Sequence, residues 1–413
     1  MFSNGRFVPL AAALCFCAIS ALGQSSTPNA HRFQLKPAPA MAHNTNLTAA
    51  SAASLPDTSP LPLFNYNIVS TRDGNTYQGV IVGRPPETRG SKAAVSVKTQ
   101  IVPIKFVFES VATSVNLTTG IITTAPGHAI SNPALPDTNC FTGSNNVPLR
   151  LLAQSPIFNP ADFNFGGTDV GATEYTDAFQ RANFWSAIDK ANYHVLLGPV
   201  EVLPTLVVPV PASQGLSLPA GIFEPAFPTC GPEGLVNIFY VDSVVIAALP
   251  TLPGVTPGTL PMFMMYNTGM PIGDPTNLAN CCAGGYHSVT VEGTALQTYS
   301  PFDFDVSGFF VSSANDTAII SHEAAEWMND PFGINPTPAW GNTGQVVGCQ
   351  ANLEVGDPLT GNLAPRIFMP NGYTYNLQEL AFFSWFYQSK SVGVNGWFSN
   401  NGTFLTNAGP PCV

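Results

Sequence analysis

The chain has 413 residues, of which 45% are hydrophobic and only 9% are charged, and its formal net charge is −11. A composition this apolar can bury a large core and argues against wholesale disorder. The acidic balance leaves no basic surface for a nucleic acid or an anionic membrane, so we expect neither as a partner.

Residues 1–23 have the pattern of a secretory signal peptide. Arg6 precedes an apolar run from Phe7 to Leu22, and Ala21 and Gly23 form a small-residue cleavage pattern. The run is too short to predict a membrane anchor. We therefore expect a protein exported to the periplasm or the cell exterior, with no membrane association after the signal is removed.

Cysteine usage agrees with export. Of the 8 cysteines, Cys15 and Cys17 lie in the signal, and the others are Cys140, Cys230, Cys281, Cys282, Cys349 and Cys412. We predict at least two disulfides among these, with Cys281 and Cys282 bonded to different partners because adjacent cysteines rarely pair with each other. No Cys-x-x-Cys pair is present to favour a thiolate zinc site.

Residues 24–60 consist largely of Ser, Thr, Ala, Pro and Asn and predict a flexible linker. A single folded domain is expected from residue 61 to 413. Residues 64–69 and 77–82 flank Asp73-Gly74-Asn75 and predict a β-hairpin, and 95–109 continues as a strand.

The rest of the chain predicts strands followed by helices. A helix is expected from Thr176-Asp177 to Asn192. Prolines recur between 195 and 270, where the strand-like segments are 206–208, 236–240 and 262–266. A central helix is expected at 317–329, and Asn376-Leu377-Gln378-Glu379 has the form of a capping box opening a C-terminal core helix. This order indicates an α+β domain with a strand-rich N-terminal half.

The central helix carries the candidate site. His322 and Glu326 stand one turn apart, a spacing that lets two side chains bind one ion, and Glu323 lies next to them. An apolar stripe of Ile320, Ala324, Trp327 and Met328 can pack against a core. Asn315-Asp316-Thr317 supplies capping side chains, and Asp330-Pro331 ends the helix.

A catalytic ion needs a third protein ligand, and Glu354 is the best candidate. Asp357 follows closely and is expected either to orient a ligand or to bind directly. Asp330 and His287 are further candidates for these supporting roles. The competing interpretation of His287 is an ordinary hydrogen-bonded histidine.

The His-Glu-x-x-Glu helix followed by Glu-x-x-Asp resembles the zincin metallopeptidases. That resemblance implies a zincin-like fold, one divalent ion, most simply zinc, held by His322, Glu326 and Glu354, and Glu323 as the general base. The substrate would be a peptide or another extracellular polymer. Glu326 stands where those enzymes have a second histidine, and the added negative charge should weaken the ion as a Lewis acid and favour harder ions such as manganese or calcium.

A closer similarity, covering about residues 280–360, is to secreted, mostly bacterial proteins with Ser-His-Glu-x-x-Glu-x-x-x-Asp-Pro followed by Glu-x-x-Asp. The plant exordium-like (phosphate-induced) extracellular proteins look related around the same helix. These similarities imply a secreted or surface role.

Three alternatives to a metallopeptidase stay open at this point. The first is a non-catalytic extracellular binding or structural protein with a degenerate site. The second is a core helix whose His and Glu simply pair with each other. Carboxylate-pair glycosidase chemistry is the third, at Asp303 and Asp305 or at Glu323 and Glu326.

Overall fold

The computed structural model describes residues 32–39, 41, 47–48, 55, 59–293, 295–407, 409 and 412. The predicted signal peptide lies outside the described residues, as does most of the predicted linker. None of the described helices is long and apolar enough to span a membrane.

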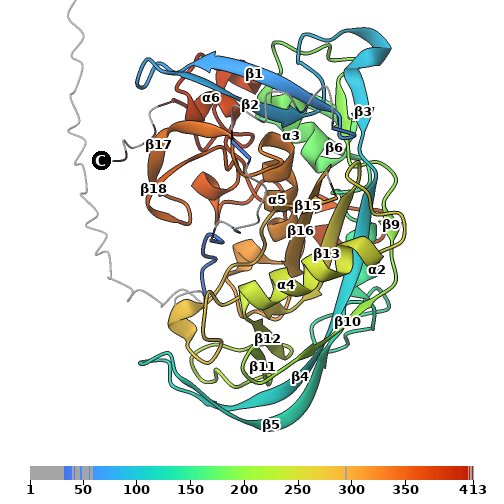
Figure 1. The fold of residues 1–413 in the computed structure, drawn as a ribbon, viewed down its shortest axis with the longest axis vertical. Coiled ribbons are helices and arrows are strands. Elements are labelled where there is room, and N and C mark those ends of the chain that lie inside the picture. The colour runs from blue at the N-terminus through green and yellow to red at the C-terminus, as the bar shows by residue number, and fades with distance from the viewer. Residues whose placement is uncertain are drawn as a thin grey trace, which may run out of the picture.

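The fold is α+β and rich in strands, as the sequence predicts. Its helices are α2 (Pro148–Ala153), α3 (Tyr175–Asn183), α4 (Ile238–Ala248), α5 (Ala318–Asn329) and α6 (Phe383–Phe386). Figure 1 shows α5 in the middle of the molecule, beside α3, with which it is in contact.

A ten-stranded mixed sheet forms the frame, with the order β14-β12-β11-β4-β13-β16-β15 and with β5, β9 and β10 also paired to β4. Its strands are β4 (Thr99–Val115), β5 (Ile122–Ser131), β9 (Glu201–Val202), β10 (Leu206–Val210), β11 (Gly215–Leu218), β12 (Glu233–Val236), β13 (Leu260–Tyr266), β14 (Thr268–Gly269), β15 (Ser288–Glu292) and β16 (Ala295–Phe304). The central strand β13 runs parallel to both β4 and β16, and every residue in it is buried. Continuous burial is typical of a strand that has parallel neighbours on both sides and both faces covered.

Five two-stranded sheets surround this frame. They are formed by β1 (Leu63–Val69) with β2 (Thr76–Val82), β3 (Ala94–Ser96) with β8 (His194–Leu196), β6 (Ala161–Phe165) with β7 (Thr168–Thr173), β17 (Pro336–Thr343) with β18 (Val346–Asn352), and β19 (Ile367–Phe368) with β20 (Thr374–Tyr375). The antiparallel β1–β2 pair is the predicted hairpin, and it lies at the opposite end of the molecule from the curved end of β4 and β5 (Figure 1).

The central helix is confirmed within one residue, but its surroundings differ from the expectation. All 12 residues of α5 are buried, so both its apolar stripe and its polar side are covered by protein. No side chain caps its N-terminus; instead the Asp316 carboxylate accepts hydrogen bonds from Thr317 N and Asn376 N. The helix ends at Asn329, before Pro331, as predicted.

Three other predicted elements are wrong or shorter than expected. Val236 ends a strand, and Asn237 then caps α4 by accepting from Phe239 N, so 236–240 is not one strand. The helix opened at Tyr175 ends at Asn183 rather than Asn192. The C-terminal helix covers only Phe383–Phe386, because Gln378 and Glu379 bond to distant groups instead of capping it.

The predicted cysteine chemistry is confirmed in number and wrong in one pairing. Disulfides join Cys140 to Cys230 and Cys349 to Cys412. The structure also joins Cys281 to its neighbour Cys282, against the expectation that these two find separate partners.

Part of the expected linker packs on the domain. Phe33 forms a parallel bridge with Phe310 and stacks on Phe309 with ring centroids 4.5 Å apart. Lys36 N donates to Cys282 O at 2.9 Å. Residues 32–39 are therefore attached to the folded domain, in contrast to the flexible linker predicted for this range.

Candidate metal centre

Helix α5 and the loop after β18 form the centre of the site. His322 Nε2 lies 2.9 Å from Glu326 Oε2, one turn along the helix. The other oxygen, Glu326 Oε1, accepts from Gly356 N at 3.0 Å and Asp357 N at 3.2 Å. These two bonds hold the loop against the helix and place Asp357 Oδ1 3.4 Å from His322 Nε2.

His322, Glu326 and Asp357 thus form a compact group, which we call the His322 cluster. One potential ligand atom from each lies within 4.8 Å of the others. All three residues are at most 4% exposed. An imidazole and two carboxylates that converge in this way are a suitable ligand set for a divalent ion.

Gln378 fixes the orientation of His322. The amide nitrogen of Gln378 donates to Gly356 O at 2.7 Å, which leaves its oxygen, 3.1 Å from His322 Nδ1, as the acceptor. Nδ1 therefore carries the proton in neutral His322, and the Nε2 lone pair faces the two carboxylates. Such an outer hydrogen bond commonly sets the tautomer of a metal-binding histidine.

Close backbone approach around the cluster requires glycine. A Cβ on Gly356 would lie 2.5 Å from His322 Cγ and Nδ1, and one on Gly285 would lie 2.7 Å from Glu323 Cγ. Both glycines allow a loop to pack directly on a site residue of α5.

His287 stands on the other side of Glu326. Its Nε2 donates to Asp330 O at 2.9 Å, and its Nδ1 lies 3.8 Å from Glu326 Oε2 and 3.9 Å from Glu323 Oε2. His287, Glu323 and Glu326 form a second group whose potential ligand atoms lie within 4.8 Å of one another. Glu326 is therefore shared by two adjacent groups.

Glu354 and Asp330 take different places from those the sequence suggests. Glu354 Oε2 lies 4.0 Å from His287 Nε2, while Oε1 accepts from Asn352 Nδ2 at 2.6 Å. Glu354 thus lies beside His287, and Asp357 is the carboxylate that approaches His322. The Asp330 carboxylate accepts from Ile334 N and Asn335 N, so this residue reaches the site through its carbonyl.

A cavity of about 450 Å³ opens onto these residues. His322, Glu323, Glu326, Glu354, Asp357 and His287 all line it. Gln345 and Gln350 also line it and donate to the two oxygens of Asp357. The N-terminal segment also lines the cavity, through Pro37, Ala38, Pro39 and Met41.

The buried charges perturb one another. Burial would lower the pKa of His287, but Glu354 and then Glu323 outweigh it and raise that pKa to about 10. The pKa of His322 is likewise raised well above its ordinary value against burial, chiefly by Glu326. Burial raises the pKa of Glu323, Glu354 and Asp357, whereas His322 overcomes burial and lowers the pKa of Glu326. Four carboxyl groups surround two imidazoles, so the protonation states of these six groups depend on one another.

The sequence pattern predicts the site residues on the helix, but it gives little indication of the residues that support them. Gln378 was assigned to a capping box, and nothing in its local sequence indicates that it contacts His322. Gly285 and Gly356 are the only local signal for the supporting residues, because Gly285 lies two residues before His287 and Gly356 directly precedes Asp357.

Comparisons of the chain with protein-family models, with curated proteins and with solved structures found no match. The proposed functional class of the protein therefore rests on the site itself.

Proposed function

We propose that the protein is a secreted metal-dependent hydrolase, peptidase-like in its chemistry, with a zincin-like arrangement around α5. The observation that carries the proposal is the convergence of His322 Nε2, Glu326 and Asp357 on the wall of a cavity, with Glu323 beside them. The disulfides support an oxidising, extracytoplasmic location. The proposed substrate is a peptide or another extracellular polymer.

The residues fit a divalent ion. Two ligand atoms at 2.0–2.2 Å from a tetrahedral ion are separated by roughly 3.3–3.6 Å. The 3.4 Å between His322 Nε2 and Asp357 Oδ1 matches this spacing, and the 2.9 Å to Glu326 Oε2 is slightly shorter. His322, Glu326 and Asp357 are the proposed ligands, with Asp357 in the place first considered for Glu354.

Each neighbouring residue has a defined part in this proposal. A bound zinc ion would act as a Lewis acid and make a water molecule more acidic. Glu323 is positioned to take a proton, because burial raises the pKa of its carboxyl towards the working range of a general base. His287 lies within 4 Å of Glu323, Glu326 and Glu354, and it can stabilise negative charge that develops in the cavity.

Two variants test the proposal. We expect elemental analysis of purified protein to find stoichiometric zinc, or manganese if the second carboxylate ligand shifts the preference to a harder ion. His322→Ala should lose that metal, while Glu323→Gln should keep it and lose hydrolysis of a denatured protein substrate by about 100-fold or more.

Glu379→Gln is the matched control. Glu379 is a buried glutamate, 1% exposed, whose carboxylate bonds to Ser399 and Thr403 away from the cavity. It should keep both metal and activity. Metal-free wild-type protein, or full activity in Glu323→Gln, would rule out the proposed hydrolase.

A second candidate is a non-catalytic extracellular binding or structural protein. It is favoured by Glu326 in place of a second imidazole and by the direct contact between His322 and Glu326, which lets the two side chains neutralise each other without an ion. In that case the wild type holds no ion in the His322 cluster and has no hydrolytic activity, and His322→Ala chiefly lowers stability.

A further inference from the structure

We propose a second cation site, separate from α5, in which Glu233, Asp303 and Asp305 bind a hard divalent cation of the calcium class. We call these three residues the acidic triad. One carboxylate oxygen from each lies within 4.8 Å of the others, and the residues are at most 2% exposed. The proposal does not depend on the hydrolase assignment.

The sheet brings the acidic triad together. Glu233 begins β12, which runs parallel to β14. Asp303 lies near the end of β16, opposite Met265 of the parallel strand β13. Asp305 follows directly after β16. Residues distant in sequence therefore meet where β13 and β16 end.

Each carboxylate accepts a backbone hydrogen bond through one oxygen, and the Ser307 side chain and the Phe310 backbone also lie near Glu233 and Asp305, respectively. Glu233 Oε1 accepts from Gly269 N at 3.1 Å, Asp303 Oδ1 from Thr268 N at 3.0 Å and Asp305 Oδ1 from Ser307 N at 2.9 Å. Glu233 Oε2, Asp303 Oδ2 and Asp305 Oδ2 are buried and have no hydrogen-bond partner among the described residues. Buried oxygens without a partner are costly, and an ion would satisfy them together.

Charge balance supports a divalent ion. Arg32, from the N-terminal segment packed on the domain, acts favourably on Asp305. Its effect is smaller than that of burial, which raises the pKa of Asp305, so a divalent cation would be the main counter-charge for the three carboxylates. Without a cation, burial and mutual repulsion raise the pKa of Glu233 and Asp303, so protonation is the competing way to neutralise the group.

The donor atoms indicate the class of ion. The acidic triad offers only oxygen, which suits calcium, magnesium or manganese better than zinc. Glu233 also lines a second cavity of about 300 Å³, together with Asp137, Tyr266 and Asn267, so this cavity reaches one of the three proposed ligands.

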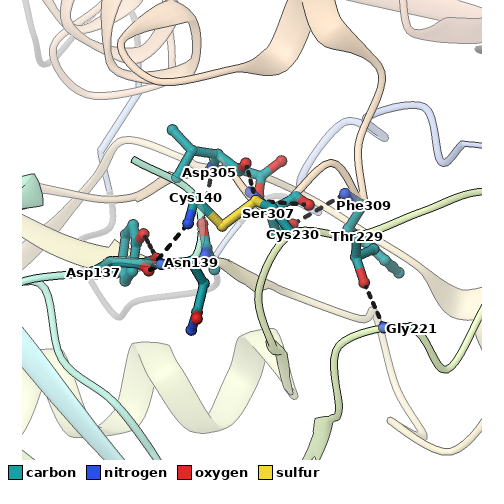
Figure 2. The surroundings of a disulfide bond; sticks show 12 residues. Asp137, Asn139, Cys140, Gly221, Thr229, Cys230, Asp305, Ser307 and Phe309 are labelled. Carbon is teal, nitrogen blue, oxygen red and sulfur yellow. Dashed lines mark hydrogen bonds between the residues drawn. A yellow bond between two sulfur atoms is a disulfide. The ribbon is translucent and has the colours of Figure 1, made fainter. Parts of the chain in front are cut away.

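A disulfide braces this region. Figure 2 shows the Cys140–Cys230 bond beside Asp305 and Ser307. Cys230 N donates to Ser307 O at 2.8 Å, and Ser307 Oγ donates to Asp305 Oδ1 at 2.6 Å. The bridge therefore ties the segment just before Glu233 to Cys140, and the hydrogen bond from Cys230 N to Ser307 O holds the same segment against the turn that orients Asp305.

The test uses full-length protein with calcium chloride as the probe, and magnesium chloride and zinc chloride as comparisons. Calcium is counted by elemental analysis after dialysis into metal-free buffer, and the Tm is measured in calcium and in EGTA. We expect wild-type protein to bind one calcium at this site and to melt a few degrees higher in calcium than in EGTA. Asp303→Asn with Asp305→Asn should weaken calcium binding about tenfold or more and remove the Tm difference.

The sign of the effect in EGTA gives a second readout. Without an ion, replacing crowded carboxylates by amides should leave the Tm unchanged or raise it, while in calcium the same change should lower it relative to wild type. Glu233→Gln gives the same comparison if the double variant does not fold. His322→Ala and Glu379→Gln should keep the full calcium response.

Three results would overturn the proposal. One is wild-type protein that neither retains nor binds calcium. Another is a calcium response that persists in the acidic-triad variants. The third is a response to zinc but not to calcium that those variants abolish, since it would place a different class of ion there.

Discussion

In the candidate metal centre, the backbone of Gly356 lies directly against the ring of His322. An alanine Cβ at 356 would lie 2.5 Å from ring atoms, so the ring would have to move away from Gln378 and from its aligned position. Loss of such an outer hydrogen bond typically costs 10–100-fold in metal affinity. We expect Gly356→Ala to weaken zinc binding by about that factor in a competitive chelator titration.

Gly258→Ala is a control for the general cost of replacing a glycine. A Cβ there would approach Pro60 at 3.2 Å, and neither residue lines the cavity. Zinc affinity should be unchanged in this variant. Equal loss in both variants would show that Gly356 has no specific role at His322.

Glu174 provides a test of pH dependence outside the metal centre. Its carboxylate accepts from Leu197 N, and burial raises its pKa from 4.5 to about 7. Between these values the folded state holds a proton that the unfolded state has released. Its contribution to stability is therefore complete below about pH 4.5 and is lost as pH rises to about 7.

We expect Glu174→Gln to reduce the loss of unfolding free energy between pH 4.5 and 7.5 by up to about 3 kcal/mol, since one pKa unit corresponds to about 1.4 kcal/mol. Urea unfolding of wild type and variant at the two pH values measures this directly. Parallel pH profiles for the two proteins would contradict the assignment.

At the scale of elements, the sequence predicts those whose signals are local. The helix 318–329 has a helical apolar stripe and a proline stop, and the first hairpin has alternating strands around Asp-Gly-Asn. Apart from Asn237, residues 236–240 are β-branched or aromatic and predict a strand, yet Asn237 caps a helix there. Burial in the fold outweighs intrinsic preference in such a segment.

The site shows the same division. The spacing of His322 and Glu326 is a property of one helix and could be predicted. The choice between Glu354 and Asp357 depends on how the 354–357 loop lies against α5, which is a tertiary contact made by two backbone N–H groups. The place of His287 likewise depends on the approach of a distant segment to Glu326.

Trp327 tests how much α5 contributes to the core. Its side chain is 0% exposed and belongs to the main hydrophobic cluster. Truncation of such a side chain usually costs about 3–5 kcal/mol, and we expect Trp327→Ala to lower the unfolding free energy by that amount. Phe368→Ala removes an aromatic ring that is 70% exposed, and in the same denaturation assay it should change stability by less than about 0.5 kcal/mol.

The Cys349–Cys412 bridge ties β18 to the C-terminal end of the chain across a sequence separation of 63 residues. A link of this kind restricts the unfolded chain and contributes about 2–4 kcal/mol. We expect Cys349→Ser with Cys412→Ser to lose stability in that range under non-reducing conditions. Under reducing conditions the wild type should lose most of this advantage, and an unchanged difference would mean that the bridge does not form.

At the scale of the whole molecule, one cluster of buried side chains joins early and late parts of the chain. It includes Leu61 and Val82 near the start of the domain and Trp385 and Phe398 near its end. Within the described residues, α5 contacts β2, α3 and β16, which come from separate regions of the sequence. The candidate metal centre is therefore supported from several directions at once.

This shared core predicts cooperative unfolding. The main cluster combines side chains of α5 with side chains of β13 and β16, so α5 and the large sheet should unfold together. Near-ultraviolet circular dichroism, tryptophan fluorescence and far-ultraviolet circular dichroism should then give coincident denaturant transitions, and saturation of the metal centre should shift all three equally. Separate transitions, with the tryptophan signal lost before the sheet signal, would show instead that α5 and its surroundings form an independent unit.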